Sequence, residues 1–377
     1  DEYLRQGKLK EIMAFILGKD GLNYGNLPKA LLIFHQYADK SRTALEEHFV
    51  EAAGYARSRG DICRLHFTVS EEFQKAVAGH VGRVIDGYQQ QYRTRFQVDF
   101  SIQKPSTNTL AVDLENRPFR NDQGRLVFRP AGHGALLYNL NDMDADLVFI
   151  KNIDNVSHDR LLPEAIPYKK ALAGYLLTLQ KQIFNYLDVL SDPDIAVKTI
   201  EGIRDYCGKS LQLSLPVHFS DRSPQEQKEI LFNLLNRPIR ICGMVKNTGE
   251  PGGGPFWVAD EQGQISRQII EQFQIDAQNA EQLRHWSAST HFNPVDLVCS
   301  IKDFRGRKFD LFRYADQNAV CISVKSEKGR SLKALELPGL WNGAMAHWIT
   351  IFIEVPMITF NPVKTVEDLL RKEHLPA

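Results

Sequence analysis

The chain has 377 residues, of which 43% are hydrophobic and 24% are charged, as is typical of a soluble globular protein. Lys plus Arg and Asp plus Glu number 46 each, so no overall charge draws the chain to nucleic acid or to an anionic membrane. The five cysteines are scattered without CxxC spacing, which argues against a disulfide scaffold or a zinc site and favours a reducing cytoplasm.

The beginning of the chain is polar and amphipathic. Residues 1–17 carry apolar side chains at helical spacing, and the first residue, Asp1, is not a methionine. We therefore expect further residues to precede Asp1 in the natural protein. The acidic start is unlike a signal peptide, and no apolar run reaches the ~18 residues that span a membrane, so we expect no membrane attachment.

The part that follows alternates between helix and strand patterns. A helix is predicted over residues 43–58, with Thr43 as its N-cap and Glu46 completing a capping box. Residues 62–69 predict a strand, a helix follows, and residues 96–102 predict another strand. This order indicates a βαβ unit and a parallel sheet.

The rest of the chain adds one long helix and further strands. Residues 146–150 predict a short strand in the buried centre of a sheet, and residues 163–190 predict the long helix. Another strand is expected over residues 239–245, and the stretches 296–324 and 348–355 are rich in strand formers. We therefore expect an α/β fold with a mainly parallel mixed sheet, a helical insertion and a C-terminal β-rich elaboration.

A histidine between two glycines stands out in the segment Arg129–Leu136. Gly132 and Gly134 flank His133, and glycines there would let the backbone approach a flat ligand while its N–H groups remain free to donate. A tight turn before a helix explains the same residues. The segment alone leaves both readings open.

An aspartate follows the predicted strand in the segment Phe149–Val156. In open α/β sheets, ligands bind beyond the carboxyl ends of the strands, and Asp154 is placed there. A carboxylate in that position can hold a divalent cation between phosphates. A helix N-cap or a turn is the alternative role for this residue.

In their order and spacing, these two segments resemble the UDP-glucose pyrophosphorylase family. In that family a Gly-His-Gly segment opens a helix, and the following strand ends in Asn-x-Asp-Asn, which here reads Asn152-Ile153-Asp154-Asn155. Shorter matches lie along most of the chain. They are Leu27–Leu32 with Lys29, Ser101–Pro105 with Gln103, His291–Asn293, and Phe360–Leu370 with Lys364.

The resemblance implies a fold and an activity. The fold would be the doubly wound, GT-A-like nucleotidyltransferase type, with a nucleotidyltransferase-like domain over residues 1–290 and a strand-rich part over residues 291–377 that completes the sugar and phosphate site. The activity would be Mg²⁺-dependent uridylyl transfer between UTP and a sugar 1-phosphate. The sequence between the matched segments is divergent. The chain also resembles a bacterial domain family of unknown function within this superfamily.

The resemblance also implies a role for each matched residue. Lys29 and Lys364 would be catalytic residues that bind phosphates, and Asp154 would bind the metal. The nucleotide would be bound by Gln103, Gly132, His133 and Gly134. The sugar would be bound by Asn152 and Asn293. Nucleotidyl transfer needs positioning and charge neutralisation above all, and two lysines with a carboxylate-held Mg²⁺ supply the neutralisation. Either lysine alone would more often be a solvated surface residue.

Two glycine-rich segments outside the resemblance add candidates for a sugar site. Thr248–Trp257 contains Glu250, which we hypothesise accepts sugar hydroxyls, although a rigid structural turn explains the segment equally well. Glu336–Met345 contains Asn342, which could line the same pocket. The remaining histidines, such as His35, lack metal-ligand spacing and are interpreted as packing or surface residues.

Three functional hypotheses follow. The glycine-rich triphosphate loop of the superfamily has no counterpart before Lys29, which we attribute to residues missing upstream of Asp1. If the natural protein lacks that loop, the chain would bind a UDP-sugar or nucleotide without catalysis. A glycosyltransferase is the third possibility because Asp142–Asp146 contains a DxD spacing, although this segment precedes its strand. The expected partners are a nucleotide and a sugar phosphate.

Overall fold

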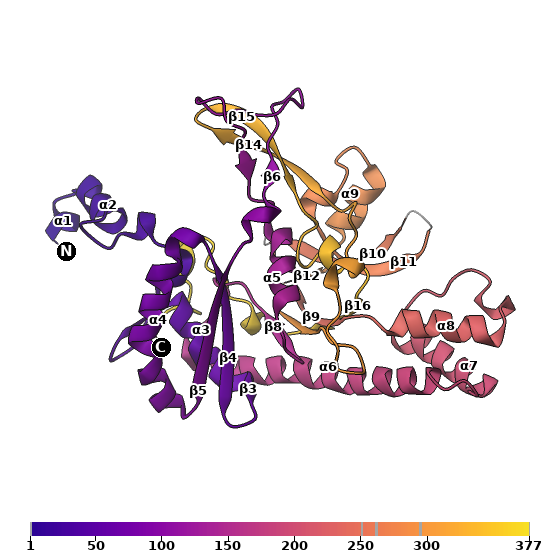
Figure 1. The fold of residues 1–377 in the computed structure, drawn as a ribbon. Coiled ribbons are helices and arrows are strands. Elements are labelled where there is room, and N and C mark those ends of the chain that lie inside the picture. The colour runs from indigo at the N-terminus through magenta and orange to yellow at the C-terminus, as the bar shows by residue number, and fades with distance from the viewer. Residues whose placement is uncertain (1, 250–251, 261–262, 294–295, 377) are drawn as a thin grey trace. The chain divides into compact units, whose positions relative to one another are not determined.

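The structure is a computed structural model, and it describes residues 2–249, 252–260, 263–293 and 296–376. Its strands form several separate sheets accompanied by helices, so the fold is mixed α/β (Figure 1). The chain divides into two compact units. The first comprises residues 1–102, 152–169 and 358–377, and the second comprises residues 103–151 and 170–357.

The first unit is built around a βαβ element. Its helices are α1 (Glu2–Arg5), α2 (Leu9–Leu17), α3 (Ala44–Tyr55) and α4 (Gln74–Tyr92), and its strands are β1 (Ile33–Gln36), β2 (Ser41–Thr43), β3 (Arg57–Ser58), β4 (Ile62–Val69) and β5 (Arg95–Ile102). Strands β4 and β5 pair in parallel along their whole length, and α4 connects them. The expected βαβ unit is therefore confirmed (Figure 1).

Helix α3 begins where the sequence predicts. The Thr43 side chain accepts from the Glu46 amide at 3.3 Å, and the Glu46 carboxylate accepts from the Thr43 amide at 2.7 Å, which completes the capping box. One core cluster of this unit joins its three sequence segments, because Phe34 and Ala44 pack with Val156 and with Val363.

The second unit contains the largest sheet and several hairpins. Its helices are α5 (Leu136–Asp142), α7 (Val197–Asp205), α8 (Pro224–Leu235) and α9 (Ala280–Ser287), while α6 (Leu162–Leu190) has its first residues in the first unit. Its strands are β6 (Thr109–Leu110), β7 (Phe128–Arg129), β8 (Val148–Ile150), β9 (Ile239–Lys246), β10 (Gly253–Ala259), β11 (Ile265–Glu271), β12 (His291–Phe292), β13 (Leu297–Ser300), β14 (Cys321–Glu327), β15 (Arg330–Glu336) and β16 (Ile349–Glu354).

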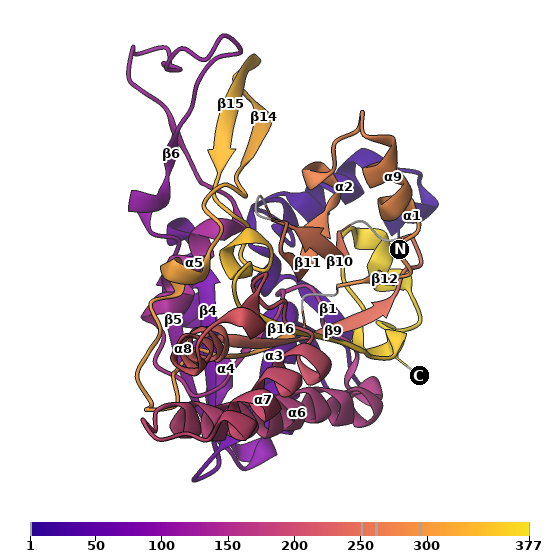
Figure 2. The same ribbon diagram turned by 90° about the vertical axis from the view of Figure 1, so that its right-hand side faces the viewer.

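The largest sheet has the order β12-β9-β13-β8, and β16 also pairs with β9. Strand β16 runs parallel to β9, and the other strands of this sheet pair antiparallel. Strand β9 is buried over all of Ile239–Val245, which is mostly apolar but includes Arg240. The β14–β15 hairpin lies beside β6 (Figure 2), and a bridge joins its Lys333 to Val112, which follows β6 in the chain.

The strand directions differ from the expectation. Among the described strands, only two of ten pairings are parallel, so a mainly parallel doubly wound sheet is not confirmed. Continuous apolar runs such as β9 occur in buried strands of either direction, and the pattern alone therefore does not set direction. Residue 290 lies inside the second unit, and the division into a nucleotidyltransferase-like domain and a strand-rich part stays a prediction. None of the helices within the described ranges has the length and hydropathy of a membrane span.

Candidate functional site

Three charged side chains from distant parts of the sequence meet in the first unit. Lys29 Nζ lies 2.9 Å from Asp154 Oδ2, and Lys364 Nζ lies 3.0 Å from the same oxygen. Lys29 Nζ also donates to the carbonyl of Val363 at 2.9 Å. We call Lys29, Asp154 and Lys364 the lysine–aspartate cluster. All three residues are among those that the sequence motifs single out.

Backbone contacts hold the segments of the cluster together. Asp154 lies in a turn, and its carbonyl accepts from the Val363 amide at 2.9 Å. The side-chain oxygen of the next residue, Asn155, accepts from the Asn361 amide at 2.9 Å. Lys29 begins a short 3₁₀ helix, Lys29–Leu31. The segment that carries Lys364 is therefore tied directly to the turn that carries Asp154.

The cluster carries an excess positive charge and spare donors. The Lys29 and Lys364 side chains are 36% and 47% exposed, whereas that of Asp154 is 9% exposed. Each ammonium has three N–H donors, and the bonds above use two from Lys29 and one from Lys364, which leaves three of the six. Two cations around one carboxylate, with donors to spare, can bind an anion such as a phosphate group.

Asp154 also offers an oxygen that could bind a metal ion. Its Oδ1 is buried and has no hydrogen-bond partner among the described residues. Mg²⁺ commonly takes one or two carboxylates and completes its coordination with water and phosphate oxygens, so one free carboxylate oxygen suits it. Within the described ranges, no group of three His, Cys, Asp or Glu side chains could enclose a metal ion. The residues fit an ion shared with phosphates better than an ion caged by protein alone.

In the second unit, His133 lies against a loop of that unit. Its Nδ1 accepts from the Leu340 amide at 3.0 Å, and its ring stacks on Trp341 with the ring centroids 4.4 Å apart. Because Nδ1 accepts, the proton of the neutral ring sits on Nε2, which faces Glu271 at 3.7 Å. Burial lowers the pKa of His133, and the Glu271 carboxylate partly opposes this shift. His133 is therefore a neutral imidazole that can donate from Nε2.

The glycines beside His133 allow this loop to come close. A Cβ atom on Gly134 would lie 2.3 Å from the carbonyl oxygen of Pro338 and 2.5 Å from that of Leu337. Gly132 has a φ of 71°, a conformation that favours glycine. The backbone of this segment does come close to a neighbour, as expected. The neighbour is the protein's own loop that contains Leu337 and Pro338, whereas the expected neighbour was a ligand. The turn before a helix is also present, since α5 begins at Leu136.

Two asparagines proposed for the sugar site are buried in the second unit. The Asn342 side-chain amide donates to Gln274 at 2.8 Å, while its side-chain oxygen has no partner in the part of the chain that is described. The Asn293 side-chain amide donates to the Gly243 carbonyl at 3.3 Å. Asn342 thus keeps an acceptor free, whereas Asn293 is engaged with the backbone of β9.

The other candidates occupy varied positions. Gln103 is half-buried, and its side-chain amide lies 3.4 Å from the Thr107 hydroxyl. Asn152 is half-buried in the turn before Asp154. Glu250 lies outside the described residues. By unit, Lys29, Asn152, Asp154 and Lys364 lie in the first, and Gln103, Gly132, His133, Gly134, Asn293 and Asn342 lie in the second.

Sequence reasoning misses a buried chain of polar groups in the first unit. His35 Nδ1 lies 2.9 Å from Glu47 Oε1, and His35 Nε2 lies 2.8 Å from His374 Nδ1. Burial, and after it the neighbouring His35, lowers the pKa of His374 to about 4. His35 is buried, as a packing residue would be, but it also links α3 to the C-terminal segment. No local pattern signals this link, because its two histidines are 339 positions apart.

The DxD segment of the glycosyltransferase hypothesis lies at the surface. Lys302 Nζ lies 2.8 Å from an Asp144 oxygen and 2.9 Å from an Asp146 oxygen. The segment ends before strand β8 begins at Val148, as the sequence predicts. These carboxylates are therefore used in a surface ion pair.

The comparison with protein families gives a clear result. The family model described as "Domain of unknown function (DUF4301)" matches residues 1–375, and the chain belongs to this family. This match confirms the expectation of a domain family without an assigned function. No curated protein matches the sequence.

Solved structures of sugar-nucleotide enzymes are similar to this one. A mutant UDP-glucose pyrophosphorylase from Leishmania major in complex with UDP-glucose is 14% identical, with a TM-score of 0.49 over 91% of this chain and 61% of that chain. A UDP-glucose phosphorylase from Trypanosoma brucei is 14% identical, with a TM-score of 0.46 over 91% of this chain and 60% of that chain.

A protein from Entamoeba histolytica, described as a candidate UDP-N-acetylglucosamine pyrophosphorylase, is also similar. It is 11% identical, with a TM-score of 0.45 over 90% of this chain and 71% of that chain. The chain thus spans 61% of the length of the Leishmania enzyme. Likeness at this level does not carry an activity or a substrate from those proteins to this chain.

Proposed function

We propose that this member of the DUF4301 family is a sugar-nucleotide pyrophosphorylase-like enzyme that catalyses Mg²⁺-dependent uridylyl transfer between UTP and a sugar 1-phosphate. A phosphate oxygen of the sugar 1-phosphate attacks the α-phosphorus of UTP. The bond from that phosphorus to the oxygen bridging to the β-phosphate breaks, and pyrophosphate leaves with the bond's electrons. The products are a UDP-sugar and pyrophosphate.

The observation that carries this proposal is the lysine–aspartate cluster. Lys29 and Lys364 share one oxygen of Asp154 and keep three N–H donors for phosphate oxygens. Such donors neutralise the charge on the transferred phosphoryl group and on the leaving pyrophosphate. Asp154 would hold Mg²⁺ through its unpartnered Oδ1, and the ion would add further neutralisation of phosphate charge.

The remaining roles complete the proposal. Gln103, Gly132, His133 and Gly134 would contact the nucleotide, with the His133 Nε2–H as a neutral donor, and Asn152, Glu250, Asn293 and Asn342 would contact the sugar. We also propose the doubly wound GT-A-like arrangement for the fold, with residues 291–377 contributing to both the phosphate and the sugar contacts. Free cysteines throughout the described residues support a reducing cytoplasm as the location.

The direct test measures pyrophosphate release by the full-length protein from UTP and a panel of sugar 1-phosphates. We expect turnover that depends on Mg²⁺. Lys29→Gln and Lys364→Gln should each lower kcat by about a hundredfold, since they remove donors that act on the developing charge. Lys75→Gln, which changes an exposed lysine on α4, is the matched control and should leave kcat unchanged. No turnover alongside micromolar UDP-sugar binding would instead identify a nucleotide-sugar binding protein.

A second test separates the lysines from the metal ligand. Asp154→Asn removes the negative charge between two ammonium groups, so pyrophosphate should bind more tightly in the absence of Mg²⁺. The same variant should lose the increase in pyrophosphate affinity that Mg²⁺ gives the parent protein. Calorimetric titrations with and without Mg²⁺ measure both effects. An undiminished Mg²⁺ effect in the variant would remove Asp154 from the metal site.

A further inference from the structure

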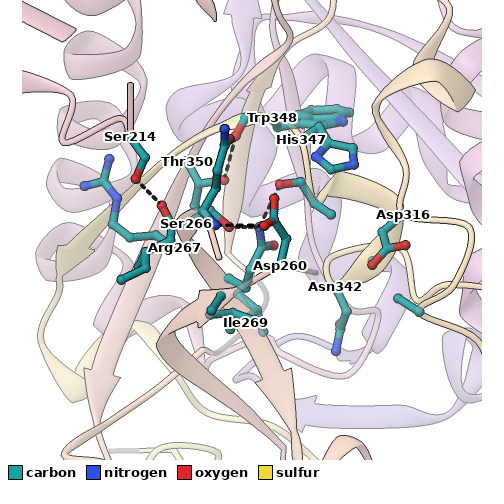
Figure 3. A pocket seen from close by; sticks show the side chains of 18 of the residues that line it. Ser214, Asp260, Ser266, Arg267, Ile269, Asp316, Asn342, His347, Trp348 and Thr350 are labelled. Carbon is teal, nitrogen blue, oxygen red and sulfur yellow. Dashed lines mark hydrogen bonds between the residues drawn. The ribbon is translucent and has the colours of Figure 1, made fainter. Parts of the chain in front are cut away.

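A pocket of about 270 Å³ opens in the second unit. It is lined by the β10–β11 hairpin, by Gln212–Ser214 and by residues of the stretch 342–350. Figure 3 shows its lining, in which basic, acidic and neutral polar side chains such as Arg267, Asp316 and Thr350 are mixed. None of the lysine–aspartate cluster belongs to this pocket.

Two arginines line the pocket and a third supports it. Arg267 on β11 and Arg237 just before β9 are half-buried lining residues. Arg240 on β9 is fully buried and donates from Nε to the hydroxyl of Thr350, another lining residue, at 2.8 Å. Burial lowers the pKa of all three guanidinium groups. Burying each of these positive charges therefore costs free energy, and an anion bound nearby would offset that cost.

In the part of the chain that the structure describes, these arginines are bonded to neutral groups and to no carboxylate. Arg267 donates to the Leu211 carbonyl and, at 3.4 Å, to the Gln212 side chain. Arg237 donates from Nε to a backbone carbonyl 3.1 Å away. These bonds use three of the ten N–H donors on the two lining guanidinium groups. Arg240 Nη2 has no partner among the described residues.

We propose that this pocket is a second anion site, which binds a small ligand bearing a phosphate or carboxylate group through Arg237 and Arg267. A guanidinium group matches either anion with two parallel hydrogen bonds and stays charged in a half-buried setting. The anion contacts need no residue of the lysine–aspartate cluster, so they can be tested separately from the proposed transfer reaction. Asn342 borders the pocket, but the anion contacts do not depend on it.

The rest of the lining defines the ligand further. Asp316 lines the same pocket, and one of its oxygens accepts a backbone amide at 2.9 Å. Carboxylates in such a lining accept hydroxyl donors well and repel a second anionic group. The pocket is also smaller than the roughly 300–1,000 Å³ usual for drug-sized ligands. The ligand is therefore a compact molecule with one anionic group and hydroxyl groups.

Labelling of arginines with phenylglyoxal tests the site in the unchanged protein. Inorganic phosphate is titrated at constant ionic strength, and peptide mass spectrometry follows the modification rate of each arginine. We expect phosphate to slow the modification of Arg237 and Arg267 by about tenfold when its concentration is ten times the Kd. Arg313, an exposed arginine of the same unit, is the internal control and should react at a constant rate. Equal rates at Arg237 and Arg267 with and without phosphate would overturn the proposal.

Calorimetry provides a second measurement that does not depend on arginine reactivity. In the Lys29→Gln/Lys364→Gln variant, which removes the cationic groups of the other phosphate site, phosphate should still bind. Adding Arg267→Gln should then weaken binding by about tenfold or more, because a charge-assisted contact is lost. Absence of binding in the double variant, or unchanged binding after Arg267→Gln, would refute the site. Parallel titrations with glycerol 1-phosphate and glycerate, which carry one anionic group and two hydroxyl groups each, then show whether phosphate or carboxylate ligands are preferred.

Discussion

Two regions of the molecule contain residues of the motifs that the sequence analysis singled out. One is the lysine–aspartate cluster in the first unit, and the other is the contact of His133 with its loop in the second unit. The side chains have different roles in the two regions. In the cluster, polar side chains meet around one carboxylate oxygen and keep donors unused. Around His133, two glycines allow close contact between two loops, and the His133 ring stacks on Trp341. The difference shows that two motifs of similar appearance in the sequence can have different structural roles, one leaving donors unused and the other packing two loops together.

The largest expected effect tests the closed contact around His133. Gly134→Ala places a Cβ atom 2.3 Å from the Pro338 carbonyl oxygen, so the backbone has to shift, and we expect a loss of about 3 kcal/mol in the free energy of unfolding. Gly202→Ala, in helix α7 with open space around the site, should instead stabilise by roughly 0.5–1 kcal/mol. Urea unfolding measures both. Equal stability of the two variants would show that the loops need not touch.

The next effect concerns the buried histidine that anchors the C-terminal segment. The pKa of His374 falls from 6.5 to about 4 in the folded protein, so between these values the unfolded chain binds more protons. Stability should therefore fall as the pH drops from 6.5 towards 4, by at most about 1.4 kcal/mol per pH unit from this group. Urea titrations across this range measure the slope, and His374→Gln should reduce it. A slope unchanged by His374→Gln would assign the pH dependence to other groups.

A smaller effect is expected when one lysine of the cluster is replaced. Lys29→Gln breaks an ion pair whose lysine is 36% exposed, so the free energy of unfolding should change by less than about 1 kcal/mol. A cluster kept for ligand binding would thus cost little stability when disrupted, in contrast to the contact of Gly134. Thermal unfolding of the variant without ligand provides the measurement. A loss of stability as large as that of Gly134→Ala would show that the cluster serves mainly to stabilise the fold.

The smallest effect is expected at the surface carboxylates of the DxD segment. Asp144→Asn and Asp146→Asn remove exposed partners of Lys302, and each should change stability by less than about 0.5 kcal/mol. Neither should alter UDP-sugar binding or its dependence on divalent cations. If either variant abolished metal-dependent UDP-sugar binding, the glycosyltransferase hypothesis would replace the one proposed above.

Local features of the fold were predictable from the sequence because short-range chemistry determines them. The capping box at Thr43, the strand Ile62–Val69 and the long helix Leu162–Leu190 all occur where their patterns predict. Strand direction and the division into units depend on pairings between distant segments, which periodicity does not report. The largest sheet is therefore mostly antiparallel, against expectation.

In the candidate site, too, local motifs were predictable from the sequence and contacts between distant segments were not. Lys29, Asp154 and Lys364 could be named in advance because each stands in a matched motif. Asn155 and Asn361 stand in the same motifs beside them, yet their hydrogen bond depends on a pairing across 206 positions. The arginines of the second-unit pocket carry no motif at all, and only their shared lack of a carboxylate partner within the described residues draws attention to them.

The discontinuous make-up of the first unit has a consequence for how the protein is made. Residue 357 ends the second unit, whereas the first unit is complete only with residues 358–377. Lys364, Asn361 and His374 are therefore synthesised after the whole of the second unit. The lysine–aspartate cluster forms only after synthesis has passed Lys364, 210 positions beyond Asp154. Folding of the proposed phosphate site therefore has to wait for the last segment of the first unit, however early Lys29 and Asp154 are made.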